Sequence, residues 1–345
     1  MIKLKLVVFN RNRLGAVLGN GEIVDLSLAY AAYLSGKGVS RPYAHAEASL
    51  PSNLQAFIEE GEPAIAAARE AIEHVETGLE KGIAGPRGEK IVYKPEEARI
   101  RAPLPSLAAR IACAGANFYD HAAGAASMRG TKVTVDDIKR DVEAGKHVPW
   151  GFWKFARNVA GPDEAVIYPA KTQRLDYEAE VAAIFGKAGK DISEAGAMDY
   201  IFGYTILNDY SLRDVREQQG SFTWGKNFDT SVGLGPCVVL KDEIPDPHVL
   251  GMELRVNGQL RQNGSMKDMI RKFPFWVSHL TKDFTFYPGD IISGGTCAGT
   301  AMDSSPRDAE GKTSPEKFLK PGDLVEAKVE RIGTLRNRVV RKGTS

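Results

Sequence analysis

The stretch RLDYEAEVAAIFGK, residues 174–187, places acids at alternate positions, Asp176, Glu178 and Glu180, and then continues into the apolar run VAAIF. The apolar run predicts a buried strand. In an extended chain, a period of two puts all three carboxylates on one face, with successive residues about 6 to 7 Å apart. Because like charges on one face repel each other, this stretch predicts that a nearby cation, or solvent, offsets them.

The composition is that of a globular protein with an ample core. The chain has 345 residues, of which 43% are hydrophobic and 26% charged, so we expect two domains or one large domain with a small companion. With 45 basic and 44 acidic residues the net charge is +1. A net charge so close to zero does not indicate binding to nucleic acid or to an anionic membrane. Small molecules or other proteins are the expected partners.

The cysteines and the N-terminus indicate a cytoplasmic protein. Cys113, Cys237 and Cys297 are far apart and show no metal-binding spacing, so we expect free thiols in a reducing compartment. The opening MIKLKLVVFNRNR has too short an apolar core for a signal peptide, and no run is long enough to span a membrane.

The first hundred residues predict a small α+β domain, residues 1–100. Residues 2–26 indicate three short strands with a hairpin turn at Gly19–Gly21. A helix is expected after Asn53, where Ile65, Ala68, Ile72 and Val75 fall on one helical face before Gly78.

Residues 101–345 differ from the first hundred residues in their pattern of strands and turns, and they predict the larger domain. Short strand patterns alternate with Gly, Pro and Asp turns, which is typical of a mostly antiparallel sandwich or barrel-like roll: AVIYP, EVAAIFG, YIFGYTILND, GPCVVL, ELRVNGQL, DIISGG and LVEAKVERIG. Residues 121–147 are polar and helical in pattern, and we expect them to form a surface lid rather than core. The fold class predicted is therefore α+β, mainly β.

A second acidic segment joins the first. In ILNDYSLRD, residues 206–214, Asp209 ends another apolar strand. Carboxylates from two strand ends form a hard, all-oxygen site suited to Mg²⁺, Mn²⁺ or Ca²⁺ rather than zinc. A solvated strand face remains the alternative for any one of these acids.

Two further residues could carry chemistry. His121 in CAGANFYDHAAG opens the expected lid, and an imidazole there could act as a general base over a pocket, although a surface histidine is the alternative. Lys226 in WGKNFDTSVGLGP could bind a substrate carboxylate or stabilise an enolate. The glycine-rich segments lack the strand and helix context of a dinucleotide-binding loop.

Six segments, taken together, resemble the fumarylacetoacetate hydrolase family, and they occur in that family's order: CAGANFYDH, RLDYEAEVAAIFGK, GYTILNDYSLRDV, GKNFDTSVGLGP, PGDIISGGTCAG and PGDLVEAKVERIGTLRNRV. The resemblance covers residues 101–342 and extends, less specifically, to the N-terminal domain. It implies a mixed β-sandwich roll and a homodimer. It also implies a divalent metal, Mg²⁺ or Mn²⁺ with Ca²⁺ as a further possibility, held by Glu178, Glu180 and Asp209.

The same resemblance assigns the remaining site residues. His121 matches the lid histidine, Lys226 and Thr230 match the KxFDT pocket residues, and Arg213 matches the arginine of NDxxxRD. Lys154, in FWKFA, matches the lysine of the family's FLKPS segment, whose Pro and Ser are replaced here. Asp176 falls outside the metal pair and is expected to support it.

The chain departs from the family pattern at two positions and in the length of its lid. Many acylpyruvate hydrolases have a Glu three residues after the lid histidine, where this chain has Gly124. His121 therefore needs another partner, with Glu143 as a candidate, or has none. Position 216 is Arg where several members have Gln, which would change the charge recognised in the substrate.

The predicted function is hydrolysis of a C–C bond in a 2,4-dioxo acid of acylpyruvate or fumarylpyruvate type, giving pyruvate and a carboxylic acid. Because Gly124 leaves the orientation of His121 open, the alternative is the same enolate chemistry without water. That class includes decarboxylation of an oxo acid, isomerisation of a hydroxydienedioate and dehydration of a 2-keto-3-deoxy sugar acid. A metal-binding or regulatory β-domain is the non-enzymatic alternative.

Overall fold

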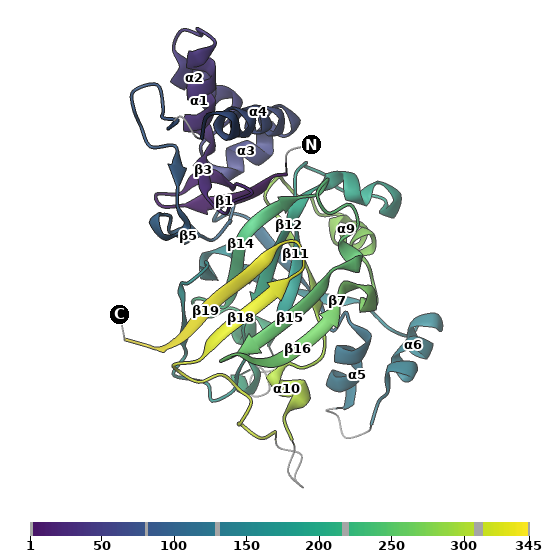
Figure 1. Ribbon diagram of the computed structural model, residues 1–345. Helices are drawn as coiled ribbons and strands as arrows, with labels where there is room; N and C mark the ends of the chain where they lie inside the picture. The colour runs from purple at the N-terminus through teal and green to yellow at the C-terminus, as the bar shows by residue number, and fades with distance from the viewer. Residues whose placement is uncertain (1–2, 80–81, 128–131, 216–220, 307–312, 344–345) are drawn as a thin grey trace.

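The computed structural model describes residues 3–79, 82–127, 132–215, 221–306 and 313–343. A group of helices and short strands from the N-terminal hundred residues lies at one end of the molecule, and the long strands of the remaining chain form its body (Figure 1). The short helices α5 (Tyr119–Ser127) and α6 (Val135–Glu143) project beside the body.

The N-terminal unit has the predicted strands, joined to helices that the sequence pattern only partly indicates. The three opening strands and their hairpin are confirmed: β1 (Lys5–Phe9), β2 (Arg13–Val17) and β3 (Ile23–Asp25). The side chains of Asp25 and Asn53 accept backbone hydrogen bonds at the starts of α1 and α3, as N-cap residues do. The other elements are α1 (Leu26–Gly36), α2 (Pro42–Ser49), α3 (Leu54–Glu60), α4 (Glu62–Gly78), β4 (Val92–Tyr93) and β5 (Ile100–Arg101).

One large mixed sheet runs through both parts of the chain. Its order is β4-β3-β2-β1-β14-β12-β11-β17-β6-β7, with β5 on β1 and β8 on β14. The strands of the body in this sheet are β6 (Arg110–Gly115), β7 (Trp150–Phe155), β8 (Val159–Ala160), β11 (Ala179–Phe185), β12 (Ile201–Asp209), β14 (Val232–Leu240) and β17 (Ile291–Thr296). Because β1 pairs with β14, the N-terminal strands extend the body's sheet, and a domain boundary near residue 100 stays a prediction.

A second sheet covers one face of the first. It runs β16-β15-β18-β19-β9, and most neighbours in both sheets are antiparallel while β6–β17, β8–β14 and β9–β19 are parallel. The predicted mixed β-sandwich is therefore confirmed. The remaining strands are β9 (Ala165–Tyr168), β10 (Leu175–Asp176), β13 (Ser211–Leu212), β15 (Gly251–Val256), β16 (Gln259–Ser265), β18 (Leu324–Val329) and β19 (Gly333–Arg341).

Strand β11 is buried on both faces, which explains its uninterrupted apolar run. Val181 and Ala183 belong to the core shared with the second sheet, whereas Ala182 and Ile184 belong to the core shared with the N-terminal helices. The row of acids that precedes this run is thereby carried into the interior.

Several shorter helices complete the body. Helices α5 and α6 confirm the helical pattern expected at 121–147, but the beginning of that segment is not on the surface. His121, Ala122 and Ala123 are buried, and the last two pack with Ile138 and Ile270. The other helices are α8 (Phe222–Lys226), α9 (Phe273–Thr281) and α10 (Ala301–Ser304), and the 3-10 turns are η2 (Pro95–Glu97), η3 (Ala156–Asn158), η4 (Glu194–Tyr200), η5 (Pro247–Val249) and η6 (Met266–Asp268).

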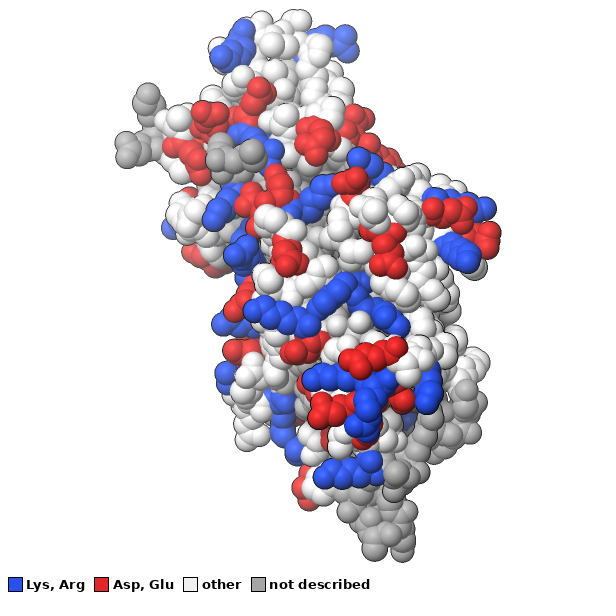
Figure 2. Space-filling model, turned by 90° about the vertical axis from the view of Figure 1, so that its right-hand side faces the viewer, with Lys and Arg blue, Asp and Glu red and all other residues white. Residues whose placement is uncertain are grey.

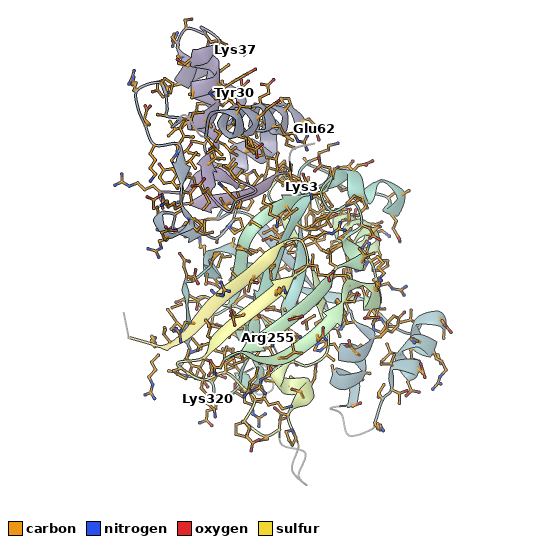
Figure 3. The ribbon with its side chains drawn as sticks, viewed as in Figure 1. Lys3, Tyr30, Lys37, Glu62, Arg255 and Lys320 are labelled. Carbon is orange, nitrogen blue, oxygen red and sulfur yellow. The ribbon has the colours of Figure 1, made fainter. Side chains whose placement is uncertain are left out.

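The outer surface is mixed in charge. On the face drawn in Figure 2, basic and acidic side chains are interspersed, and polar side chains such as Lys37 and Arg255 lie at the outside of both parts of the molecule (Figure 3). No helix among the described residues is both long and apolar enough to cross a membrane.

Replacing Leu6 by Ala tests whether the N-terminal unit and the body share one core. Leu6 is fully buried on β1 opposite Val238. We expect the substitution to lower the free energy of unfolding by about 2–5 kcal/mol in a single transition followed by denaturant titration. Lys3→Ala, at an exposed position just before the same strand, is the control and should change little. Two separate transitions, with only one of them shifted, would contradict a shared core.

Candidate metal centre and active site

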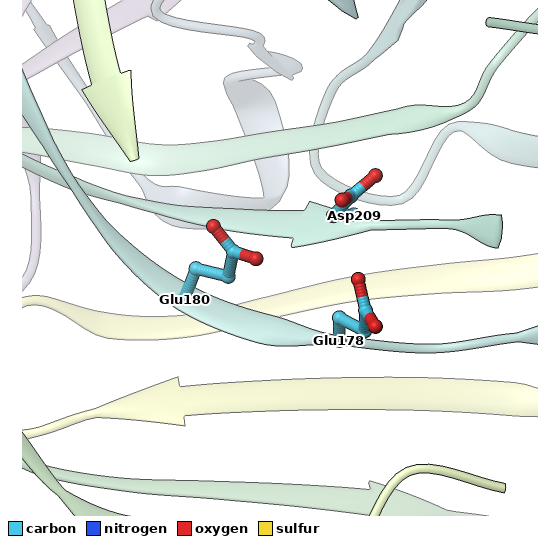
Figure 4. Close-up of side chains that lie close together, drawn as sticks. All are labelled: Glu178, Glu180 and Asp209. Carbon is cyan, nitrogen blue, oxygen red and sulfur yellow. The ribbon is translucent and has the colours of Figure 1, made fainter. Parts of the chain in front are cut away.

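Neighbouring strands bring three carboxylates together in the body of the protein. Asp209 ends β12, and its backbone N–H donates to the carbonyl of Glu178, 2.9 Å away, just before β11. One oxygen from each of Glu178, Glu180 and Asp209 lies within 4.8 Å of the others, and all three residues are buried. Figure 4 shows their carboxylates converging from the two strands. The acids predicted to share a metal therefore lie together.

Basic side chains surround two of the three acids. Lys226 Nζ lies 2.5 Å from Glu178 Oε2 and 2.6 Å from Asp209 Oδ2. Lys154 donates to the other oxygen of Asp209, and Arg213 donates to Glu178. Glu180 has neutral partners, accepting from the Ser293 hydroxyl and the Gly295 N–H.

The charges within this cluster do not cancel. Among the residues that the structure describes, the buried cluster holds five carboxylates and three cations: Asp176, Glu178, Glu180, Asp209 and Asp303 against Lys154, Arg213 and Lys226. The carboxylates therefore outnumber the lysine and arginine cations. Uncompensated charge is costly in a buried place, so a bound cation or a proton is needed to offset the difference.

The protonation equilibria point the same way. Burial, together with the charges of Asp209 and Glu178, raises the pKa of Glu180 to about 8. Burial acts in the same direction on Glu178, but Arg213 and Lys226 lower the pKa of that carboxyl well below its usual range. Glu180 is thus the ligand that most needs a further cation. The all-oxygen donor set, the excess charge and Glu180 all fit a hard divalent ion.

His121 has a carboxylate partner that the sequence did not indicate. Its Nδ1 lies 2.7 Å from Asp303 Oδ2, and its Nε2 lies 4.0 Å from Glu178 Oε1. The expected candidate Glu143 was wrong, since that residue is exposed on α6 while Asp303 on α10 makes the contact. Burial disfavours the imidazolium, but Asp303 and Glu178 outweigh it and raise the pKa of His121.

Gly124 and Asp303 are linked in space. A Cβ atom at position 124 would lie 3.4 Å from Asp303 Oδ1, so the longer side chain of a Glu there would need the space that Asp303 fills. The acid that contacts His121 thus lies on a segment 182 residues away in the sequence rather than on the histidine's own helix. No local pattern around His121 could have signalled it.

Asp176 supports the site through Arg213 and the start of α10. Its carboxylate accepts from Arg213 Nε at 2.8 Å and from the backbone N–H groups of Ala301 and Met302 at 2.7 and 3.1 Å. It therefore anchors both Arg213 and the start of α10, which carries Asp303. This is a supporting role of the kind expected for Asp176.

The remaining predicted site residues differ in whether they line the cavity. Lys226 and Arg213 line the cavity beside the carboxylates, whereas Lys154 is buried behind it on Asp209. Thr230 lies elsewhere, with its hydroxyl accepting from the Ile167 N–H at 2.8 Å and donating to the Asp229 carbonyl at 2.5 Å. The structure does not bring Thr230 to the cavity as predicted, and Arg216 lies outside the described residues.

The cavity itself is small and two-sided. It measures about 70 Å³. His121, Glu178, Glu180, Arg213, Lys226 and Asp303 form its polar part, while Trp150, Phe152 and Phe222 add an aromatic part. Such a space suits a short, polar molecule with one apolar surface.

Comparison with known proteins decides the family. The model of the fumarylacetoacetate hydrolase C-terminal family matches residues 110–340. The chain belongs to the fumarylacetoacetate hydrolase family. The matched range contains each residue of the carboxylate cluster, His121 and Asp303, so the candidate site lies wholly within the family's domain.

Two curated relatives of the chain are named as oxaloacetate tautomerases. The chain is 33% identical over 335 residues to the oxaloacetate tautomerase YisK of Bacillus subtilis, covering 96% of this chain and 97% of that protein. It is 32% identical over 294 residues to the mitochondrial oxaloacetate tautomerase FAHD2A of Homo sapiens, covering 85% and 81%.

Solved structures show the same fold. A fumarylacetoacetate hydrolase from Exiguobacterium antarcticum matches with a TM-score of 0.68 and 25% identity over 98% of this chain and 100% of that one. A maleylpyruvate hydrolase from Sphingobium sp. SYK-6, solved with manganese(II) and pyruvate, matches with a TM-score of 0.66 and 24% identity over 98% and 99%. This chain is thus an enzyme of a family that includes tautomerases and hydrolases.

Substituting Glu180 tests the metal centre by binding alone. Its partners are neutral, so Glu180→Gln removes a ligand charge without leaving a buried cation unpaired. We expect the affinity for Mn²⁺, measured by isothermal titration calorimetry, to fall more than about 100-fold, beyond what loss of a supporting partner costs. The control is Glu143→Gln, on exposed helix α6, which should bind as the wild type does. An unchanged affinity in Glu180→Gln would remove that residue from the ligand set.

Proposed function

We propose that the protein interconverts the keto and enol forms of a short 2-oxo dicarboxylic acid, with oxaloacetate as the reference substrate, in a metal-dependent reaction. The observation that carries this proposal is the Asp303–His121 pair beside the carboxylate cluster, because one oriented imidazole can take and return the single proton that tautomerisation moves. The two relatives named as oxaloacetate tautomerases support it, as does the small cavity.

A divalent ion bound by Glu178, Glu180 and Asp209 would act as a Lewis acid that stabilises negative charge on the substrate's oxygens. The manganese and pyruvate in the maleylpyruvate hydrolase of the same fold support this assignment. Mg²⁺ and Mn²⁺ both satisfy an all-oxygen site.

His121 would move the proton. Its Nδ1 is held by Asp303, which leaves Nε2 directed toward the carboxylates at Glu178. In this arrangement Nε2 removes a proton from C3 of the keto acid, and the electron pair of the C–H bond becomes the C2–C3 double bond of the enolate. The partner carboxylate holds the ring orientation and stabilises the imidazolium.

The cationic side chains would complete the reaction at the oxygen. Burial disfavours the Lys226 ammonium, but Asp209 and Glu178 raise its pKa, so it stays charged and can donate a hydrogen bond to the enolate oxygen. The imidazolium of His121 would then return its proton to that oxygen, which gives the enol, and the reverse sequence gives the keto acid. Arg213, fixed by Asp176 and Glu178, adds a positive charge for a substrate carboxylate.

Hydrolysis of a 2,4-dioxo acid is the second candidate, and one observation favours it. Gly124 gives His121 no orienting acid on its own helix, but Asp303 supplies one from α10. The same histidine could then remove a proton from water instead of from carbon.

The two candidates are separated by following both reactions with Mn²⁺-loaded protein. Tautomerisation is read as faster loss of the ultraviolet absorbance of enol oxaloacetate. Hydrolysis is read with acetylpyruvate and fumarylpyruvate in H₂¹⁸O, as heavy oxygen in the carboxylic acid released. We expect acceleration of the first reaction. Incorporation of ¹⁸O without any acceleration would overturn the tautomerase proposal in favour of hydrolysis, and release of CO₂ from oxaloacetate would indicate decarboxylation.

Asp303→Asn tests the role of the carboxylate that orients His121. The amide keeps the shape but cannot stabilise the imidazolium, so we expect kcat to fall by about 10² or more. Affinity for Mn²⁺ should change far less than in Glu180→Gln. Glu143→Gln serves as the matched control and should keep full activity. Equal kcat values for Asp303→Asn and the wild type would exclude His121 held by Asp303 as the proton-transfer group.

A further inference from the structure

Strand β7 leads from the carboxylate cluster to the surface. Lys154, Phe152 and Trp150 alternate along it, so they share one face of the strand. Lys154 is buried on Asp209, the ring of Phe152 lies 4.8 Å from Lys226 Nζ, and Trp150 is 36% exposed. Successive members of this row are about 6 to 7 Å apart. A molecule held at the carboxylates and extending along Phe152 therefore meets Trp150 before it meets solvent.

The indole of Trp150 is held in place from two sides. Its backbone partner on β6 is Gly115, and a Cβ atom at that glycine would lie 2.4 Å from the indole ring. The ring thus lies directly on the backbone of Gly115, where only a glycine leaves room. On another side the ring of Phe222 packs against it with centroids 4.8 Å apart. All three residues line the cavity.

We propose that Trp150, held by Gly115 and Phe222, closes the mouth of the cavity and restricts the enzyme to short 2-oxo acids. The inference rests on the proposed function, because it names which 2-oxo acids the same site admits. A four-carbon acid keeps all its oxygens near the polar part of the cavity. A 2,4-dioxo acid with a bulky group beyond C4 places that group where the indole lies.

The same strand supplies a matched control. Trp153 has a similar exposure of 40%, but it alternates to the opposite face of β7 and lines a separate surface cavity with Phe155 and Phe284. Replacing Trp153 by Ala removes the same type of side chain from the same strand as replacing Trp150, but it leaves the mouth of the cavity beside the carboxylates unchanged.

The test is calorimetric binding of two probes to the Mn²⁺-loaded protein. Oxalate carries only the chelating oxygens, and benzoylpyruvate carries the same 1-carboxylate and 2-oxo group with a phenyl ring beyond C4. We expect Trp150→Ala to raise the affinity for benzoylpyruvate relative to oxalate by about tenfold or more, the scale on which a pocket wall discriminates size. Trp150→Phe should give a smaller rise in the same ratio, and Trp153→Ala should leave it unchanged.

The outcomes separate this proposal from the proposed reaction. An unchanged ratio in both Trp150 variants, or an equal rise in Trp153→Ala, overturns the role of Trp150 whatever the protein does to oxaloacetate. A raised ratio in a protein that does not tautomerise oxaloacetate overturns the proposed reaction and supports the role of Trp150. Binding of neither probe by the wild-type protein overturns both, because the cavity would then not accept 2-oxo acids.

Discussion

The structure depends on how a cluster of carboxylates is kept in the protein interior. Glu178, Glu180 and Asp209 are buried at the ends of two central strands, where unpaired charge would cost several kcal/mol per ion. The cations that offset this charge come from separate elements, since Lys154 is on β7 and Lys226 is on α8. Burial of the acids therefore couples the packing of the central sheet to the packing of the segments around it.

The three buried carboxylates differ in what offsets their negative charge. Cations that hold Glu178 and Asp209 lower the cost of burying those acids, whereas Glu180, with its raised pKa, is held only by neutral donors among the described residues. A divalent ion would satisfy that remaining demand, and in the proposed reaction it would also stabilise the negative charge of the enolate. Relatives that tautomerise or hydrolyse can share such a centre, because the reaction differs in where the proton of the histidine comes from. In the proposed function, the surroundings of His121 and the mouth at Trp150, rather than the metal ligands, would decide between substrates.

Local sequence patterns predicted much of the fold. Strands β9, β11, β12, β14 and β17 lie where apolar runs and turns placed them, because each run is bounded by Gly, Pro or Asp and buried on the sheet. Helices α1 and α2 were not foreseen, and neither was β7, whose WGFWKF pattern exposes large apolar residues that a strand normally buries. Its four aromatic residues are explained only by what lies on either side of the strand, namely the cavity beside the carboxylates for Trp150 and Phe152 and a separate surface cavity for Trp153 and Phe155.

The acids by themselves suggested a hard, all-oxygen cation site, because the period of an extended chain puts them on one face and such ions prefer oxygen. The choice of Glu178, Glu180 and Asp209 as the ligands came from the resemblance to the family and stays a prediction, although the structure brings these three carboxylates together. The partner of His121 is different in kind. Asp303 is 182 residues away in the chain, and it reaches the imidazole because Asp176 anchors α10 and Gly124 leaves space. Contacts between distant segments have no local signature, so the tertiary structure alone decided which acid contacts the histidine and which side chains line the cavity.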